Sequence, residues 1–364
     1  MFPTLNSDNV ARFRRLTLFL APGFLTLTTS LTLISCAPTT QKSETSSSAA
    51  NANVSNTQIS GIKTKVLRMG YQQAGDLVRI TKVLEKRLEP LGVKVEWAQF
   101  AQGPQLMEAM NVGKIDLGSV GETPPIFAQA AGAKIVYVVG SRRDQNSGKG
   151  SAIGVPPNSP IKSVKDIKGQ KVFFQKASAS HYFLLRALED VGLNKDDIQK
   201  VSLPTVESNA AFLQGKIPVW VTNDPYLALA EKENKIRVLK TAQGLDSPGG
   251  YYIGAKQFAI DNLELLRVVI EEIDKIQRWA EANPKDAAQL IVPFQKLPLD
   301  IMETVVKRRT LGLRPITPDL IKEQQKVADY FYKNGVIPQS VNIQEATLTP
   351  EQYAAITPPS ISQK

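Results

Sequence analysis

The chain contains few side chains that perform covalent or metal chemistry. Its 364 residues include one cysteine, Cys36, and one histidine, His181. Zinc sites combine several cysteine, histidine or carboxylate ligands, so this scarcity argues against a His/Cys metal centre. An enzymatic alternative is a hydrolase or transferase that uses Ser178 or Ser180 with His181 and a carboxylate. Neighbours within one helical turn rarely supply a nucleophile and an in-line base, and the sequence has no Gly-x-Ser-x-Gly elbow. We therefore expect no enzyme, no cofactor and no metal.

Polar residues suited to anion binding stand at four points where a strand-like run changes to a helix-like one. These junctions are 72–75, 119–125, 176–181 and 223–226. In a parallel sheet, ligands bind beyond the carboxyl ends of the strands, where the following helices present their N-termini. Free N–H groups and the helix dipole attract anions there. Several such ends around one cleft would hold a small oxyanion, and the alternative for each junction is ordinary helix capping.

The elements that must position these junctions alternate between β-rich runs and amphipathic helical stretches. Alternation at this spacing is typical of βαβ units on a parallel sheet. A polar, glycine-containing loop at 142–150 separates two such series, so we predict two α/β lobes, and the chain is also long for a single core. The predicted strands are 66–71, 93–97, 115–117, 135–139, 171–174, 219–221 and 236–239.

Long helices follow after about Tyr251. Thr317-Pro318 and Thr349-Pro350 are N-cap and first-turn pairs that mark helix starts. Apolar residues at helical spacing predict packing faces in this part of the chain. The clearest stripe consists of Leu265, Val268, Val269, Ile273 and Ile276.

The N-terminal segment follows the plan of a secretory signal. Three arginines lead into an apolar run at 16–33, which ends in Leu33-Ile34-Ser35-Cys36. The run is almost long enough to span a bilayer, which is the rival interpretation. Its end resembles the bacterial lipobox, whose cysteine receives a diacylglyceryl group, and a buried unpaired cysteine is the alternative role for Cys36. Residues 36–61 are rich in Ser, Thr, Ala and Asn and predict a disordered tether.

The formal charge of +10 is consistent with acidic lipid surfaces and anionic solutes as partners. It does not predict nucleic-acid binding, because the lysines are scattered along helices and are not interleaved with aromatic residues in a compact patch.

Several motifs, in order along residues 66 to 345, resemble those of the aliphatic-sulfonate-binding proteins of ABC importers. The resemblance implies a type II periplasmic-binding fold, in which two parallel-sheet lobes joined by a two-strand hinge enclose a ligand cleft, with C-terminal helices. Taurine- and nitrate-binding proteins are near relatives of that family. The motifs lie at 103–105, 111–118, 121–133, 159–162, 166–169, 175–181 and 224–226.

The resemblance also implies ligand-binding positions. Glu122 stands where the family usually has Asp, and it could cap the helix, pair with a basic residue or hold a substrate ammonium; we favour capping or pairing. His181 is either a polar residue of the first helical turn or a ligand contact, and is expected to be neutral. Pro218 and Asn223 depart from the family pattern before Asp224. The positions expected at the ligand are Gln73, Ser119, Glu122, Thr123, Ser178, Ser180, His181 and Asp224.

The sequence therefore predicts an extracytoplasmic solute-binding lipoprotein of the periplasm or cell envelope. It would act as a monomer, capture a small anionic alkanesulfonate and deliver it to an ABC permease and its ATPase. The alternatives are a receptor of the same fold for taurine, nitrate or a pyrimidine precursor. The predicted segments are a signal peptide at 1–35, a tether at 36–61, the first part of lobe 1 at 62–150, lobe 2 at 151–247, the return to lobe 1 with helices at 248–345, and a tail at 346–364.

Overall fold

The computed structural model describes residues 62–72 and 76–362. The predicted signal peptide, the tether and two of the predicted functional residues, Cys36 and Gln73, lie outside the described residues. Within the described part of the chain, none of the helices has the length and apolar character needed to cross a membrane.

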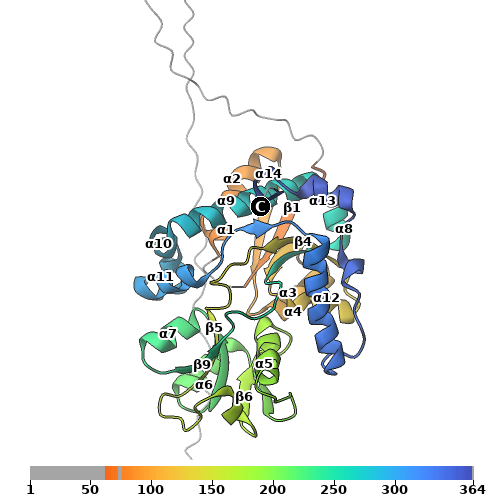
Figure 1. The fold of residues 1–364 in the computed structure, drawn as a ribbon. Helices are drawn as coiled ribbons and strands as arrows, with labels where there is room; N and C mark the ends of the chain where they lie inside the picture. Colours follow the sequence, from red (N-terminus) through yellow and green to blue (C-terminus); the bar gives the residue numbers. More distant parts are fainter. Residues whose placement is uncertain (1–61, 73–75, 363–364) are drawn as a thin grey trace, which may run out of the picture. The chain divides into compact units, whose positions relative to one another are not determined.

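The first lobe is built on a six-stranded sheet with the strand order β11-β4-β10-β3-β1-β2 (Figure 1). Strand β1 pairs in parallel with the edge strand β2 and with β3, and β10 lies antiparallel between β3 and β4. The strands are β1 (Val66–Tyr71), β2 (Lys94–Gln99), β3 (Leu117–Val120), β4 (Ile135–Ser141), β10 (Tyr251–Ala255) and β11 (Leu313–Arg314).

The second lobe is built on a five-stranded sheet with the order β7-β6-β8-β5-β9. Strand β6 pairs in parallel with β7 and β8, whereas β5 is antiparallel to β8 and β9. The strands are β5 (Ser151–Val155), β6 (Lys171–Phe174), β7 (Gln199–Ser202), β8 (Val219–Asn223) and β9 (Arg237–Thr241).

Both sheets are mixed, whereas the sequence predicted parallel ones. The chain passes from the first sheet to the second between Ser141 and Ser151, and it returns between Thr241 and Tyr251. A strand that follows such a crossing enters its new sheet from the side of the other lobe. For this reason β5 and β10 run against the strands of the βαβ units, whose carboxyl ends face the opposite lobe. The two crossing segments form the two-strand connection of a type II periplasmic-binding fold.

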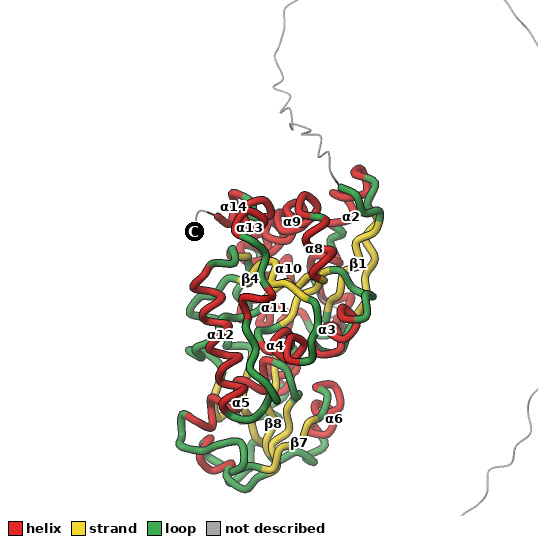
Figure 2. Tube along the Cα trace, turned by 90° about the vertical axis from the view of Figure 1, so that its right-hand side faces the viewer, coloured by secondary structure: helices red, strands yellow, loops and turns green. Residues whose placement is uncertain are grey.

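Helices cover both sheets, and the strands lie inside them (Figure 2). The second lobe carries α5 (Ala179–Glu189), α6 (Thr205–Leu213) and α7 (Tyr226–Lys232), together with the 3-10 turn η2 (Val164–Ile167). The first lobe carries α1 (Leu77–Ile80), α2 (Val83–Leu88), η1 (Glu89–Leu91), α3 (Gly103–Asn111), α4 (Thr123–Ala130), α8 (Lys256–Asp261), α9 (Leu263–Ala282), α10 (Pro284–Gln295), α11 (Leu299–Arg308), α12 (Pro318–Lys333), η3 (Ile343–Ala346), α13 (Pro350–Ile356) and α14 (Pro359–Ser362).

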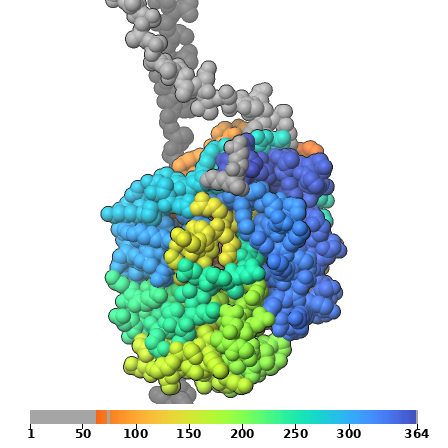
Figure 3. Space-filling model, viewed as in Figure 1, coloured from red at the N-terminus to blue at the C-terminus, as the bar shows by residue number. Residues whose placement is uncertain are grey.

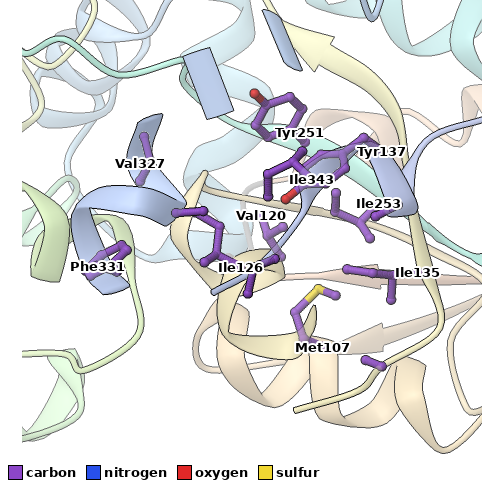
Figure 4. Close-up of a cluster of buried hydrophobic side chains, with 14 of the residues drawn as sticks. Met107, Val120, Ile126, Ile135, Tyr137, Tyr251, Ile253, Val327, Phe331 and Ile343 are labelled. Carbon is purple, nitrogen blue, oxygen red and sulfur yellow. The ribbon is translucent and has the colours of Figure 1, made fainter. Parts of the chain in front are cut away.

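The C-terminal helices complete the core of the first lobe. Four residues of the predicted stripe on α9 are buried, and Ile276 is partly buried. Figure 4 shows Val327 and Phe331 of α12 facing apolar side chains of the sheet and of α4. The segment predicted to be a tail instead contains α13 and α14. It is ordered because Ile356 is buried and the Tyr353 hydroxyl donates to the Tyr137 carbonyl over 2.7 Å.

Candidate functional site

A cleft of about 480 Å³ is lined by residues of both sheets, of both crossing segments and of the loop after α11. Figure 3 shows the first crossing segment, in yellow, at the surface between α11 and α12. Apolar residues such as Leu77, Val78 and Phe183 line part of the cleft. Its polar lining consists of Asp76, Ser119, Glu122, Ser141, Arg142, Arg143, Ser147, Ser151, Ser180, Asn223, Asp224, Ser247, Tyr252, Gln277, Arg308, Arg309 and Thr310.

Two junctions from opposite lobes meet at this cleft. Ser119 and Glu122 stand at the end of β3 and the start of α4, and Ser180 lies in the first turn of α5. The two junctions approach closely, since a Cβ added to Gly121 would lie 3.1 Å from the Cβ of Ala179. The N-termini of an eight-residue and an eleven-residue helix, with a half-buried hydroxyl beside each, thus face one space. Such an arrangement can hold an anion without a covalent step.

Glu122 is the buried carboxylate of this region, with 4% of its surface exposed. It occupies the N-cap position of α4 but makes no side-chain capping bond. The Thr123 hydroxyl donates to its Oε1 over 3.2 Å. Burial raises the pKa of Glu122, and its hydrogen bonds together with the nearby Arg143 act in the opposite direction. This environment fits pairing with a basic residue better than helix capping.

Three predicted residues lie behind the cleft wall. Thr123 is fully buried, and the Ser178 hydroxyl donates to the Gln175 carbonyl over 2.8 Å at the N-cap of α5. Neither side chain lines the cleft, and His181 does not line it either. Their prediction as ligand contacts rested on the resemblance of their sequence motifs to a known family. A motif does not show which residues of a helix start face the cleft and which face away from it.

His181 is packed among aromatic rings, with 4% of its surface exposed. Its ring centroid lies 4.9 Å from that of Phe174 and 5.6 Å from that of Phe331. Its Nδ1 accepts a hydrogen bond from the Ala177 N–H over 3.4 Å. Burial, together with the nearby charges of Lys176 and Lys200, lowers the pKa of His181 to about 4, so the imidazole is neutral at neutral pH. Among the described residues, no serine hydroxyl forms a hydrogen bond with this imidazole that would make it a catalytic base.

Asp224 directly follows β8 and lines the cleft. Its Oδ1 accepts from the Ala228 N–H over 3.0 Å and lies 3.4 Å from Nη1 of Arg308. Burial raises the pKa of Asp224 to about 6, and Arg308 opposes that rise. A Cβ added to Gly150 would lie 2.7 Å from Oδ2, so a larger residue at this end of the first crossing segment would displace the carboxylate.

The arginines of the cleft were not among the residues predicted from the sequence. Arg142 and Arg143 begin the first crossing segment, and Arg308 and Arg309 end α11. Arg143 donates to the carbonyls of Leu245 and Ser247 in the second crossing segment. The first pair was visible only as part of a polar loop. The second pair gave no signal, because a basic last turn is common in helices and the return of α11 to the cleft depends on tertiary packing.

Comparisons with known proteins place this fold and cleft among solute-binding proteins. Residues 89–287 match the model of the family described as NMT1/THI5 like. An aliphatic sulfonates-binding protein of Escherichia coli is 37% identical over 292 residues, which are 79% of this chain and 90% of the relative. The structure of the alkanesulfonate-binding protein SsuA from Xanthomonas axonopodis pv. citri bound to MOPS is 32% identical, with a TM-score of 0.75, and the match covers 78% of this chain and 98% of that one. The periplasmic aliphatic sulphonate binding protein SsuA from Escherichia coli matches with a TM-score of 0.71 over 79% of this chain and 93% of that one, at 37% identity.

Proposed function

The chain belongs to the NMT1/THI5-like family, and from this premise we propose that it is an extracytoplasmic solute-binding lipoprotein that captures small organic sulfonates for an ABC importer. The single observation that carries the proposal is the meeting of the β3–α4 junction and the α5 N-terminus at one cleft, in a chain so similar to sulfonate-binding proteins. The ligand would be bound and released unchanged.

In this proposal the sulfonate oxygens accept hydrogen bonds from Ser119, Ser180 and the N–H groups of the adjoining helix starts. The apolar part of the lining, with Leu77, Val78 and Phe183, would contact the organic body of the ligand. Hydroxyl and amide donors suit a sulfonate because they stabilise its charge and bring no counter-charge that must itself be desolvated.

A serine hydrolase finds no support in the geometry. The Ser178 hydroxyl donates to the Gln175 carbonyl, and the Nδ1 of His181 accepts from a backbone N–H. A receptor for a zwitterion such as taurine has one observation in its favour, namely the carboxylate of Glu122 in the cleft lining. We retain the simple sulfonate as the proposed ligand because Glu122 has Arg143 as an electrostatic partner.

The membrane anchor and the partners belong to the same proposal. Cys36 would carry the lipid, residues 36–61 would tether the binding lobes, and a permease with its ATPase would receive the ligand. The apolar run before Cys36 and the composition of the tether support this arrangement.

Thermal-shift screening of the full chain tests the proposed ligand class. MOPS, ethanesulfonate, taurine, nitrate and sulfate would be compared at equal ionic strength. A ligand at a hundred times its dissociation constant stabilises the folded state by about 2.7 kcal/mol, which is readily detected. We expect ethanesulfonate and MOPS to raise the melting temperature most. A shift with taurine alone would narrow the ligand to an aminosulfonate, a shift with nitrate alone would replace sulfonate by nitrate, and no shift with any of them would overturn the proposal.

A further inference from the structure

The two lobes touch on both flanks of the cleft, and the two contacts differ in chemistry. On one flank α7 of the second lobe lies beside α11 of the first (Figure 1), and charged side chains connect them. On the other flank α5 packs against α4 and α12 through aromatic rings. The aromatic contact buries His181, Tyr182 and Phe331 almost completely.

Arg308 is the centre of the charged flank. It ends α11, and its guanidinium reaches two carboxylates of the second lobe. Nη2 lies 2.6 Å from Oε2 of Glu231, and Nη1 lies 3.4 Å from Oδ1 of Asp224. The Arg308 side chain is 23% exposed, so water only partly screens these interactions. A third interlobe pair, Lys232 with Asp300, has a distance of 2.6 Å but is well exposed on both sides.

The exposure of these ion pairs to water determines how much each contributes to the attraction between the lobes. An exposed pair such as Lys232 with Asp300 contributes little. A guanidinium that binds two carboxylates from a half-buried position contributes more, because its planar fork is already oriented for both. Arg309, the next residue, adds to this attraction, since it lies in the field of both Asp224 and Asp76.

We propose that Arg308 is a positioning residue for ligand retention, which holds the Asp224-bearing wall of the second lobe against the first and so slows the escape of a bound sulfonate. This inference rests on the proposed function. It assigns Arg308 no contact with the ligand, although the side chain borders the cleft. The aromatic flank keeps the lobes associated, so loss of Arg308 opens the cleft on the side of α7 and α11.

The main test compares Arg308→Gln with Lys307→Gln in the full chain. Lys307→Gln is the matched control, because it removes the positive charge next to Arg308 in α11. The ion-pair partner of Lys307 is Glu303, which lies in the same helix and not in the other lobe. With MOPS as the probe in stopped-flow displacement, Arg308→Gln should raise the dissociation rate about ten- to a hundredfold, the effect of losing charge-assisted hydrogen bonds, with little change in the association rate. Lys307→Gln should match the wild type.

Glu231→Gln distinguishes a positioning role from direct ligand contact, because Glu231 binds Arg308 but does not line the cleft. If Arg308 acts by holding the lobes, Glu231→Gln raises the dissociation rate as well. If Arg308 instead binds the anion directly, freeing it from Glu231 leaves the rate unchanged or lowers it, and the proposal is overturned. If Arg308→Gln fails to fold, Glu231→Gln still tests whether Arg308 acts by holding the lobes together.

A measurement on the ligand-free full chain separates this inference from the proposed function. Hydrogen exchange of residues 226–232 in α7 should accelerate in Arg308→Gln and in Glu231→Gln, whereas exchange of residues 318–333 in α12 should stay as in the wild type. This result holds even if MOPS does not bind, an outcome that would count against the proposed ligand class alone. Unchanged exchange in α7 in both variants would overturn the role of Arg308.

Discussion

Acidification should charge His181, and its surroundings determine how much stability is then lost. The pKa of this imidazole falls from 6.5 to about 4 on folding, because it is buried among aromatic rings and the charges of Lys176 and Lys200 lie nearby. The unfolded chain therefore binds a proton at a pH where the folded chain does not. A lowered histidine pKa means that the stability is fully present above pH 6.5 and is lost as the pH falls toward 4. Between pH 7 and pH 4 the loss is about 3 kcal/mol, at about 1.4 kcal/mol for each pKa unit.

The wild type alone would not reveal this loss, because Asp224 has the opposite dependence. Its pKa is raised from 3.8 to about 6, so the folded chain gains stability as the pH falls through this range. That gain is about 2 kcal/mol between pH 7 and pH 4 and hides much of the histidine effect. The informative quantity is the difference between variants in the pH dependence of the unfolding free energy.

Urea unfolding of the wild type, His181→Gln and Asp224→Asn at pH 7 and pH 4 makes that comparison. Relative to the wild type, His181→Gln should lose about 3 kcal/mol less on acidification, and Asp224→Asn should lose about 2 kcal/mol more. Any effect of a substitution on packing is present at both pH values and cancels in the difference. Equal acid loss in the wild type and His181→Gln would show that the imidazole already titrates normally, and would refute the burial argument.

The remaining predictions concern the anchor and the ligand. Cys36→Ser should release the protein from membranes and abolish incorporation of labelled lipid, whereas continued membrane fractionation would contradict a lipid anchor. Ser180→Ala should weaken MOPS binding in calorimetry about ten- to a hundredfold; Ser178→Ala should weaken it less, because that hydroxyl donates to a backbone carbonyl, and equal losses would contradict this. Glu122→Gln should weaken ethanesulfonate and taurine binding to a similar extent and lower the melting temperature, because the carboxylate has Arg143 as its electrostatic partner; a selective loss of taurine binding with an unchanged melting temperature would mean that Glu122 holds the ammonium group of the ligand.

The local sequence pattern predicted some strands of the two sheets but not others. The predicted strands 66–71 and 171–174 have the same bounds as β1 and β6. By contrast, β5, β7, β10 and β11 were not predicted. Strands β5 and β10 each contain a glycine at a close tertiary contact: a Cβ on Gly154 would lie 2.3 Å from Ile236, and one on Gly254 would lie 3.0 Å from Val138. Close packing between elements is invisible in a local pattern.

Helix starts could be predicted where a side chain caps its own helix. Thr317 and Thr349 accept from the N–H groups of Leu320 and Gln352, as their Thr-Pro sequences indicate. The possible cap at Glu122 does not form, because its side chain makes no capping bond although it is the N-cap residue of α4. Residues of three predicted junctions, 119–125, 176–181 and 223–226, line the cleft, because the carboxyl ends of the strands in βαβ units face it. Which side chain of a junction lines the cleft depends on the rotation of the following helix, which the sequence does not determine.

The charges of the cleft constrain how it can recognise an anion. Three carboxylates line it, and each has an arginine in its electrostatic surroundings: Arg143 for Glu122, Arg308 for Asp224, and Arg309 for Asp76. Arginines occupied in this way leave little positive charge for the ligand. The attraction must then come from the helix N-termini and the hydroxyls, whose partial charges act at short range.

This distribution of charge has a consequence for binding kinetics. Long-range steering of an anion requires unpaired positive charge, and its rate falls steeply with added salt. Short-range donors such as Ser180 act only after the ligand has entered and therefore influence its dissociation. Since Arg308 and Glu231 also act on dissociation, through an ion pair between the lobes, added salt should change the dissociation rate of MOPS more than its association rate. A steep fall of the association rate with salt would show instead that the arginines of the cleft attract the ligand directly.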